Sequence, residues 1–193
     1  MESAIGFLAE AVPKLCAMSV RPATLVDAAK LAEIHVAAWR AAYADQMPPE
    51  FLAGMRVEDR TAMWQKSLSE PSQRVVFVSL DEAGDPVAWC VCGPSRDEDA
   101  KDSAIGELIA LNVHPTAWRS GHGKALYQWV LAYARSQHWS SIMLWVLRGN
   151  GRARAFYEKL GFEADGTEKQ EFERLGFLLD ELRYQMRVED AGD

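Results

Sequence analysis

The chain has 193 residues, of which 49% are hydrophobic and 25% charged. This ordinary globular mixture excludes a disordered tail, a collagen-like repeat and a coiled coil. The length fits one domain, since domains usually contain roughly 100–200 residues. With 21 basic and 28 acidic residues the net charge is −7, which argues against a protein that binds nucleic acid over a broad basic surface.

Membrane insertion and secretion are not expected either. The longest apolar runs, residues 75–80 and 87–92, are far shorter than the ~20 residues of a membrane-spanning helix. The apolar stretch near the N-terminus is interrupted by Glu10 and Lys14, unlike a secretory signal. We therefore predict a cytoplasmic protein with no nucleic-acid or membrane partner.

Cysteine and histidine usage predicts no metal site and no disulfide framework. Three cysteines cannot close such a framework. Cys90 and Cys92 lie two apart in an apolar run and face the same side of a strand, so we expect buried, reduced thiols. The four histidines are scattered along the chain and suggest no shared metal.

The first part of the chain is predicted to form a strand followed by helices. Residues 1–17 are expected to be an N-terminal extension, 18–188 a single domain and 189–193 a tail. A strand is expected over 18–24, and Thr24 can cap a helix over 26–43, where Leu31, Ile34 and Ala38 recur at helical spacing. Further helices are expected from Pro48 onward and over 57–68.

The remainder alternates between strands and helices. Strands are expected over 74–80 and 86–92, joined by the turn at 81–85, and over 104–113 after a polar loop at 94–103. Helices at 121–137 and 150–160 flank a strand at 141–147, and Gly161 suits the position just past a helix end. Closing strands are expected over 162–167 and 179–188. This order predicts a mixed α/β sheet.

The segment Trp-Arg-Ser-Gly-His-Gly-Lys, residues 118–124, lies between a predicted strand and a predicted helix. Gly121 and Gly123 permit backbone geometry that other residues avoid. Successive N–H groups can then converge on an anion, with the partial positive charge of the helix N-terminus behind them. The segment predicts a pyrophosphate cradle, although an ordinary tight turn would also contain these glycines. The segment is not a dinucleotide-binding fingerprint, because Leu126 stands where that fingerprint needs a third glycine.

Local charge also indicates an anionic ligand. Residues 118–160 contain seven basic residues and one acid, Glu158, so this segment carries +6 within a chain of −7. Such separation suggests a small polyanion, and with the glycine loop it favours a phosphate-bearing cofactor. A solvated basic helix face is the alternative.

A third pattern begins at Asn150, which follows a predicted strand and can cap the next helix. Tyr157 lies two helical turns further along the same face. Ala153, between them, leaves room for a ligand. The alternative is a capped helix with a packed Phe156-Tyr157 pair.

Together, the strand at 104–113, the loop at 118–124 and the segment at 150–162 resemble the GNAT superfamily of acyl-CoA-dependent N-acyltransferases, with a similarity that covers 18–188. The resemblance implies a mixed, mostly antiparallel central sheet with flanking helices, and acetyl-CoA as cosubstrate. The family often has Gln or Arg where this chain has Trp118, and Arg119 is the candidate substitute.

The resemblance also assigns cofactor-binding residues. The loop would bind the CoA pyrophosphate through its backbone N–H groups, the pantetheine arm would pair with the end of the strand, and Asn150 and Tyr157 would lie near the cofactor and its sulfur. The residues so assigned are Leu111, Asn112, Val113, Arg119, Ser120, Gly121, His122, Gly123, Lys124, Asn150 and Tyr157.

Two residues are predicted to be catalytic. Glu107 interrupts an apolar strand, where a carboxylate is costly unless it is paired or solvated. We expect it to be the general base, since several GNAT enzymes have a glutamate at a similar distance before the loop; an exposed strand end is the alternative. Tyr157 would protonate the departing thiolate.

Four residues are predicted to bind the acceptor. His35, Trp39 and Tyr43 lie on the first helix, which by resemblance walls the acceptor site, and Trp145 could line the same cleft. Helical aromatics are also typical of a core.

The sequence thus predicts transfer of an acetyl group from acetyl-CoA to a primary amine of a small molecule or peptide, by direct attack within a ternary complex. Alternatives are a non-catalytic acyl-CoA sensor or partner module, or a structural role in a larger assembly. A homodimer is compatible with such a fold, and the acceptor is left open.

Overall fold

The computed structural model describes residues 18–100, 104–171 and 177–189. The predicted extension at 1–17 and residues 190–193 of the predicted tail lie outside these ranges. The helices described are α2 (Ala28–Ala42), α3 (Pro49–Gly54), α4 (Val57–Ser69), α5 (His122–Ser136) and α6 (Gly151–Lys159). The strands are β1 (Val20–Pro22), β2 (Val75–Leu80), β3 (Pro86–Pro94), β4 (Ile105–Val113), β5 (Ser141–Leu147), β6 (Glu163–Glu171) and β7 (Leu179–Arg187).

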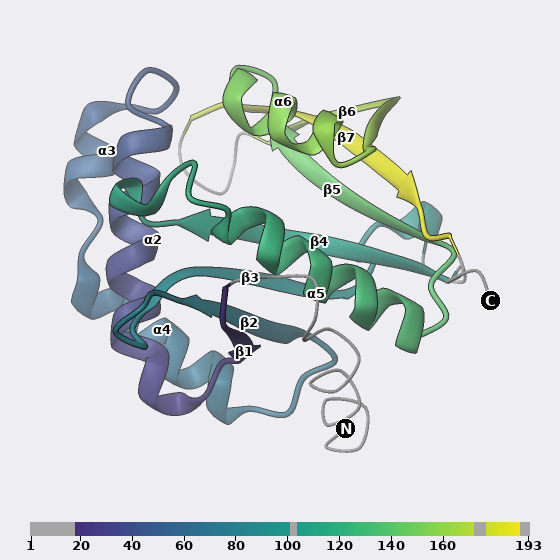
Figure 1. Cartoon of the computed structure of the whole chain (residues 1–193). Helices are drawn as coiled ribbons and strands as arrows, with labels where there is room; N and C mark the ends of the chain where they lie inside the picture. Colours follow the sequence, from purple (N-terminus) through teal and green to yellow (C-terminus); the bar gives the residue numbers. More distant parts are fainter. Residues whose placement is uncertain (1–17, 101–103, 172–176, 190–193) are drawn as a thin grey trace.

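These strands form one twisted sheet in the order β1-β2-β3-β4-β5-β7-β6 (Figure 1). Neighbouring strands are antiparallel, except that β4 and β5 are parallel. The predicted mixed, mostly antiparallel fold is therefore confirmed. None of the helices in the described ranges is long and apolar enough to cross a membrane.

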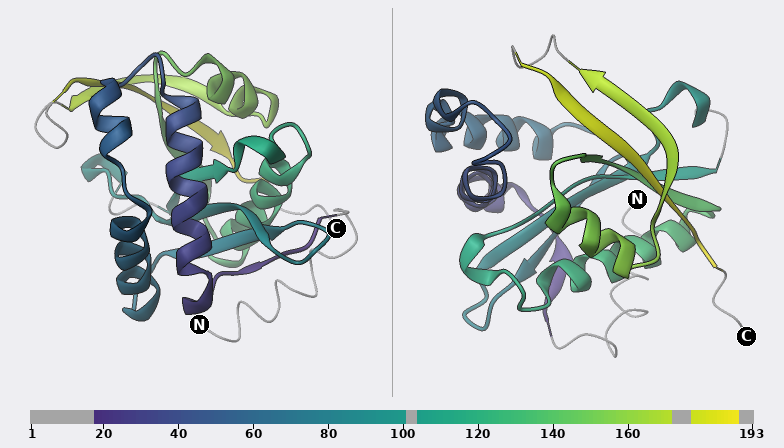
Figure 2. Two further views of the ribbon diagram at one scale, coloured as in Figure 1. Left: turned by 90° about the vertical axis from the view of Figure 1, so that its left-hand side faces the viewer. Right: turned by 90° about the horizontal axis from the view of Figure 1, so that it is seen from above.

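Helices cover both faces of the sheet, as the two views of Figure 2 show, and an apolar core lies on each face. On one face, α5 and α6 pack over a core that includes Phe77, Leu126 and Phe162. On the other face, α2 and α4 pack against β2 and β3, with Trp64 and Trp89 in edge-to-face contact at 4.7 Å. A smaller cluster joins α2 and α3 to the ends of β5 and β7.

The central strands separate after a short region of pairing. β4 pairs with β5 only over Ile105–Glu107, although both strands continue beyond it. On its other edge β4 stays paired with β3 to Val113, with a shift in register between Val91 and Cys92. The edge of β4 that faces β5 therefore opens onto the space between the diverging strands, which Figure 1 shows.

Several boundaries differ from the sequence predictions. The strand predicted at 18–24 is shortened to β1, because after one further hydrogen bond, from the Ala23 N–H to the Val76 carbonyl oxygen, the chain enters a 3-10 helix at Leu25. The helix predicted at 26–43 begins with a 3-10 turn over Leu25–Asp27, where the Asp27 carboxylate accepts a 2.7 Å hydrogen bond from the backbone N–H of Thr24. β6 is longer than the predicted 162–167. Cys90 and Cys92 are buried and free, as predicted.

Candidate active site

A cavity of about 790 Å³ occupies the space where β4 and β5 separate. Its walls come from α2, β4, the loop before α5, α5 itself, β5, α6 and β7. Most of the residues predicted to form the site line this cavity: Trp39, Tyr43, Leu111, Asn112, Val113, Arg119, Gly121, His122, Gly123, Lys124, Trp145, Asn150 and Tyr157. Glu107, Ser120 and His35 are not among the lining residues.

One wall is the edge of β4 from Leu108 to Val113. Because this stretch has no pairing with β5, its outward-pointing amide and carbonyl groups are available to an extended ligand, as at any strand edge. The predicted pairing of a pantetheine arm with this edge is compatible with that geometry.

The loop between β4 and α5 has two residues with positive φ, Arg119 at 66° and Gly121 at 96°. A non-glycine residue in this region is uncommon and marks a loop held by its surroundings. The Trp118 indole N–H donates a 2.8 Å hydrogen bond to the carbonyl oxygen of Val113, which ties the loop to the end of β4. The helix starts at His122, so its first N–H groups face the loop.

Two further residues at this helix start explain how the loop sits. A Cβ added at Gly123 would lie 3.1 Å from the ring of Phe156, so a glycine here lets α5 and α6 approach closely. His122 turns its side chain away from the loop, and its Nδ1 makes a 2.9 Å hydrogen bond with the Ser79 hydroxyl. Burial lowers the pKa of His122. At this position the backbone, not the imidazole, is the group available to an anion.

Four of the seven basic residues in the segment 118–160 line the cavity: Arg119, Lys124, Arg152 and Lys159. The Arg152 guanidinium lies 3.5 Å from the centroid of the Trp118 ring, in a cation–π contact. The other three have partners elsewhere: Arg135 with the Glu189 carbonyl, Arg148 with Asp180 and Glu168, and Arg154 with the Tyr184 hydroxyl. Much of the local positive charge is therefore directed into the cavity.

Asn150, Tyr157 and Tyr43 line the same cavity. Asn150 caps α6 as predicted, since its Oδ1 accepts a 3.1 Å hydrogen bond from the N–H of Ala153. Tyr157 is 9% exposed. Burial, with a smaller contribution from nearby Tyr43, raises the pKa of Tyr157 well above its usual range. Burial also raises the pKa of Tyr43, and the negative charge of Glu181 adds to the effect. Both phenols are therefore neutral at physiological pH.

Glu107 does not line the cavity, and its carboxylate is paired with an arginine. Its carboxylate is 1% exposed, so the alternative of an exposed strand end is wrong. Arg96 binds it through Nε at 2.9 Å, through the backbone N–H at 3.1 Å and through Nη2. This pairing explains how an apolar strand tolerates a carboxylate. The role of Glu107 as general base stays a prediction.

The aromatic residues predicted to bind the acceptor divide into two groups. Trp39 and Tyr43 make an edge-to-face pair at 5.2 Å and line the cavity together with Trp145. His35 packs its ring against Trp39 and Trp89, is 8% exposed and forms no hydrogen bond within the described residues. His35 therefore belongs to the helix–sheet core beside the cavity and does not border it.

Sequence reasoning missed Glu181, which borders the cavity from β7. Alternation along β7 could have placed it with Leu179 and Arg183 on the face opposite the buried Leu182 and Tyr184. The pattern gives no sign that this face borders a cavity. Arg96, the partner of Glu107, was missed because it lies in a polar loop.

Comparison with known proteins agrees with this architecture. A family model described as the acetyltransferase (GNAT) family matches residues 29–162. The chain is 28% identical over 165 residues to the uncharacterized N-acetyltransferase YuaI of Bacillus subtilis (strain 168), covering 86% of this chain and 90% of that protein. It is 49% identical over 59 residues to a mycothiol acetyltransferase of Salinispora tropica, covering 30% of this chain and 19% of that protein.

Solved structures share the fold at low sequence identity. The paia N-acetyltransferase from Thermoplasma acidophilum, in complex with coenzyme A, has a TM-score of 0.68 and 16% identity, covering 89% of this chain and 99% of that chain. The yncA acetyltransferase from Salmonella typhimurium, with acetyl-CoA, has a TM-score of 0.64 and 20% identity, covering 92% and 98%. Because the family model spans well over half of the sequence, the predicted family is confirmed: the chain belongs to the acetyltransferase (GNAT) family.

Proposed function

We propose that the protein transfers an acetyl group from acetyl-CoA to a primary amine of a small molecule or peptide, in the cytoplasm and within a ternary complex. The observation that supports this most is the cavity itself, which is bordered by an unpaired strand edge and by four cationic residues. An elongated cosubstrate with phosphates at one end and an amide-containing arm at the other suits both features.

The residues present fit this cosubstrate. Its pyrophosphate would bind the N–H groups of the loop and the start of α5, where the positive φ of Arg119 and Gly121 shapes the backbone. Lys124 and Arg152 would add charge-assisted contacts. The arm would pair with β4 from Leu111 to Val113. Acetyl-CoA supplies a thioester whose acyl carbon is open to attack by an amine.

The chain's own residues would then transfer protons and stabilise the negative charge that develops during the reaction. An alkylammonium, with a pKa near ~10.4, must lose a proton before it can attack. Glu107 is the predicted acceptor of that proton, directly or through water. A backbone N–H of β4 would stabilise the negative charge that develops on the acyl oxygen, an effect worth roughly 3–4 kcal/mol in other enzymes. Tyr157, neutral and buried in the cavity wall, would donate its proton to the leaving thiolate.

Two measurements test this proposal. Calorimetry should show acetyl-CoA binding, and Lys124→Met should weaken it roughly tenfold or more, as loss of a charge-assisted hydrogen bond does. Arg135→Met is the matched control, because Arg135 lies on the same helix but contacts the Glu189 carbonyl. Release of the CoA thiol in the presence of an amine panel should then demonstrate transfer. Binding without release on any amine would support a sensor instead.

A further inference from the structure

The cavity contains a carboxylate that the proposed cosubstrate does not need. Among the described residues that line it, Glu181 is the one acidic side chain. The cationic lining residues lie on the loop before α5, on α5 and on α6, whereas Glu181 faces the cavity from β7. Opposite charges attract and like charges repel in such a partly desolvated space. The β7 side of the cavity is therefore suited to a cation rather than to the phosphates of a cosubstrate.

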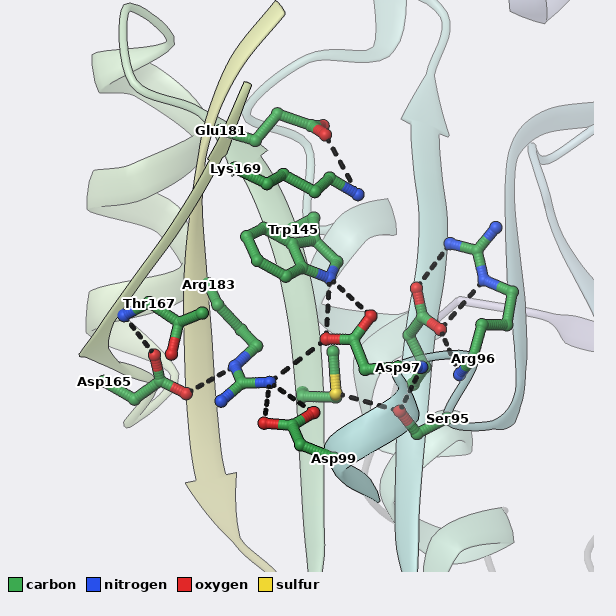
Figure 3. Close-up of polar contacts among 12 residues, drawn as sticks. Ser95, Arg96, Asp97, Asp99, Trp145, Asp165, Thr167, Lys169, Glu181 and Arg183 are labelled. Atoms are coloured by element: carbon green, nitrogen blue, oxygen red, sulfur yellow. Dashed lines mark hydrogen bonds and ion pairs between the residues drawn. The ribbon is translucent and has the colours of Figure 1, made fainter. Parts of the chain in front are cut away.

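A primary ammonium already sits against this carboxylate. Lys169 and Glu181 are register partners on β6 and β7, and the Lys169 Nζ lies 3.2 Å from Oε2 of Glu181. The same Nζ lies 4.3 Å from the centroid of the Trp145 ring. Figure 3 shows the lysine between the carboxylate and the indole. A carboxylate and the face of an indole are the groups that bind an alkylammonium.

The Trp145 ring is fixed by contacts on its other side. Its indole N–H donates to both carboxylate oxygens of Asp97 at 3.2 Å. Asp97 is in turn held by Arg183, whose Nη1 lies 3.1 Å from it (Figure 3). A ring held by such supporting contacts presents its face in one orientation, which is the condition for a specific binding site.

This ammonium pocket lies next to the groups proposed to take part in transfer. Glu181 borders the same cavity as Tyr43 and Tyr157. Its negative charge helps to raise the pKa of Tyr43, and Tyr43 helps to raise the pKa of Tyr157. A cation bound by Glu181 would therefore lie at the wall of the cavity in which transfer is proposed.

We propose that Glu181 and the face of Trp145 bind the ammonium group of the acceptor, and that Lys169 occupies this pocket until the acceptor displaces it. The inference rests on the proposed acetyl transfer and narrows its acceptor to cationic primary alkylamines. Glu181 is then a specificity-determining residue, and Lys169 an internal competitor for the same carboxylate. Removing the two side chains should change acceptor binding in opposite directions.

The test is a steady-state comparison at saturating acetyl-CoA, following release of the CoA thiol. The wild-type protein is first given 2-phenylethylamine, 1,5-diaminopentane and L-alaninamide, and the best acceptor serves as the probe. Glu181→Gln should raise the KM for that probe about tenfold or more, with kcat within threefold and acetyl-CoA affinity unchanged. Lys169→Gln should lower the KM by about two- to fivefold, the range for loss of a partly exposed ion pair.

Two control variants keep the result specific. Glu163→Gln removes an exposed carboxylate at the other end of β6, and Lys66→Gln breaks an exposed Lys–Glu pair on α4; neither should alter the KM. An unchanged KM for Glu181→Gln, or a higher KM for Lys169→Gln, would overturn the inference while leaving acetyl transfer established. If the wild-type protein releases no thiol with any of the three amines, the proposed transfer fails first, and this inference fails with it.

Discussion

Trp118 and Val113 join the loop at 118–124 to β4, the strand that precedes it. The indole N–H of Trp118 donates to the carbonyl oxygen of Val113 at 2.8 Å, and the Arg152 guanidinium lies over the same indole at 3.5 Å. One side chain thus links β4, the loop and α6. These contacts give Trp118 a structural role in holding the loop.

Trp118→Phe tests that role. Phenylalanine keeps an aromatic face for Arg152 but cannot donate to Val113, so the loop should lose one restraint. We expect acetyl-CoA affinity to fall by about three- to tenfold, equivalent to one hydrogen bond of roughly 0.5–1.5 kcal/mol. Titration calorimetry measures the acetyl-CoA affinity of each variant. Trp129→Phe, a similar change in the buried core away from the cavity, should lower the thermal midpoint without changing affinity, and equal affinity losses in the two variants would contradict the prediction.

Glu107→Gln distinguishes a base from a purely structural carboxylate. Removal of the charge that binds Arg96 should lower the free energy of unfolding by about 1.5–3 kcal/mol, the range for hydrogen bonds to charged groups. If Glu107 also accepts the amine proton, the acidic limb of kcat/KM against pH should be lost or shifted, with acetyl-CoA affinity nearly intact.

Arg96→Gln is the matched control for that experiment, because it breaks the same ion pair and leaves the carboxylate in place. It should destabilise the protein while keeping an acidic limb in the pH profile. If both variants destabilise the protein and neither alters the profile, Glu107 serves to anchor the loop after β3 and the proton goes elsewhere.

Contiguous motifs made much of the site predictable. The loop at 118–124 and the helix from Asn150 to Tyr157 are each built from residues close in sequence, so spacing alone places their groups on one face. The fold class also followed from the order of elements. Glu107 was noticed because a carboxylate interrupts an apolar run, but its partner Arg96 is eleven residues away across an irregular loop.

Other parts of the site depend on long-range packing that no local pattern encodes. Glu181, which the sequence did not indicate, comes from β7 and lines the same cavity as the predicted Tyr43 and Trp145, because β4 and β5 stop pairing after Glu107. Trp39 and His35 are one helical turn apart, yet one ring lines the cavity and the other faces Trp89. Helical spacing predicts that two residues lie on the same face of a helix. Which of them lines the cavity depends on the elements that pack against that face.

His35 predicts a loss of stability in mild acid. Burial, with a smaller contribution from Arg60, lowers its pKa from 6.5 to about 4. In the unfolded chain His35 is therefore protonated below about pH 6.5, whereas in the folded protein it is protonated only below about pH 4. The contribution of the neutral His35 to the free energy of unfolding is complete above pH 6.5. It decreases as the pH falls, by about 2 kcal/mol at pH 5.

Urea unfolding of His35→Leu at pH 7.5 and pH 5 measures this effect. The variant cannot titrate at this position, so its loss of stability between the two pH values should be smaller than that of the wild type by about 2 kcal/mol. His138→Asn, which replaces an exposed histidine, is the matched control variant in the same measurement. An unchanged pH dependence in His35→Leu would show that other groups cause any acid destabilisation.

Tyr157→Phe tests the proposed acid. The substitution keeps the ring, which packs edge-to-face against Phe156 and Phe162 at 5.3 and 5.8 Å, and removes only the hydroxyl. If that hydroxyl protonates the departing thiolate, kcat should fall roughly 10²-fold, the low end for general acid catalysis. The thermal midpoint and acetyl-CoA affinity should barely change, because no apolar volume is lost.

Tyr127→Phe is the matched control for Tyr157→Phe. Tyr127 is also buried in the core that includes Tyr157, but its hydroxyl contacts Met186 Sδ at 2.9 Å and it does not line the cavity. Loss of the Tyr127 hydroxyl should leave kcat unchanged even if the thermal midpoint falls slightly. Because burial raises the pKa of Tyr157, its proton becomes easier to transfer only as negative charge develops on the sulfur. Full turnover by Tyr157→Phe would therefore exclude the acid role and leave solvent as the proton source.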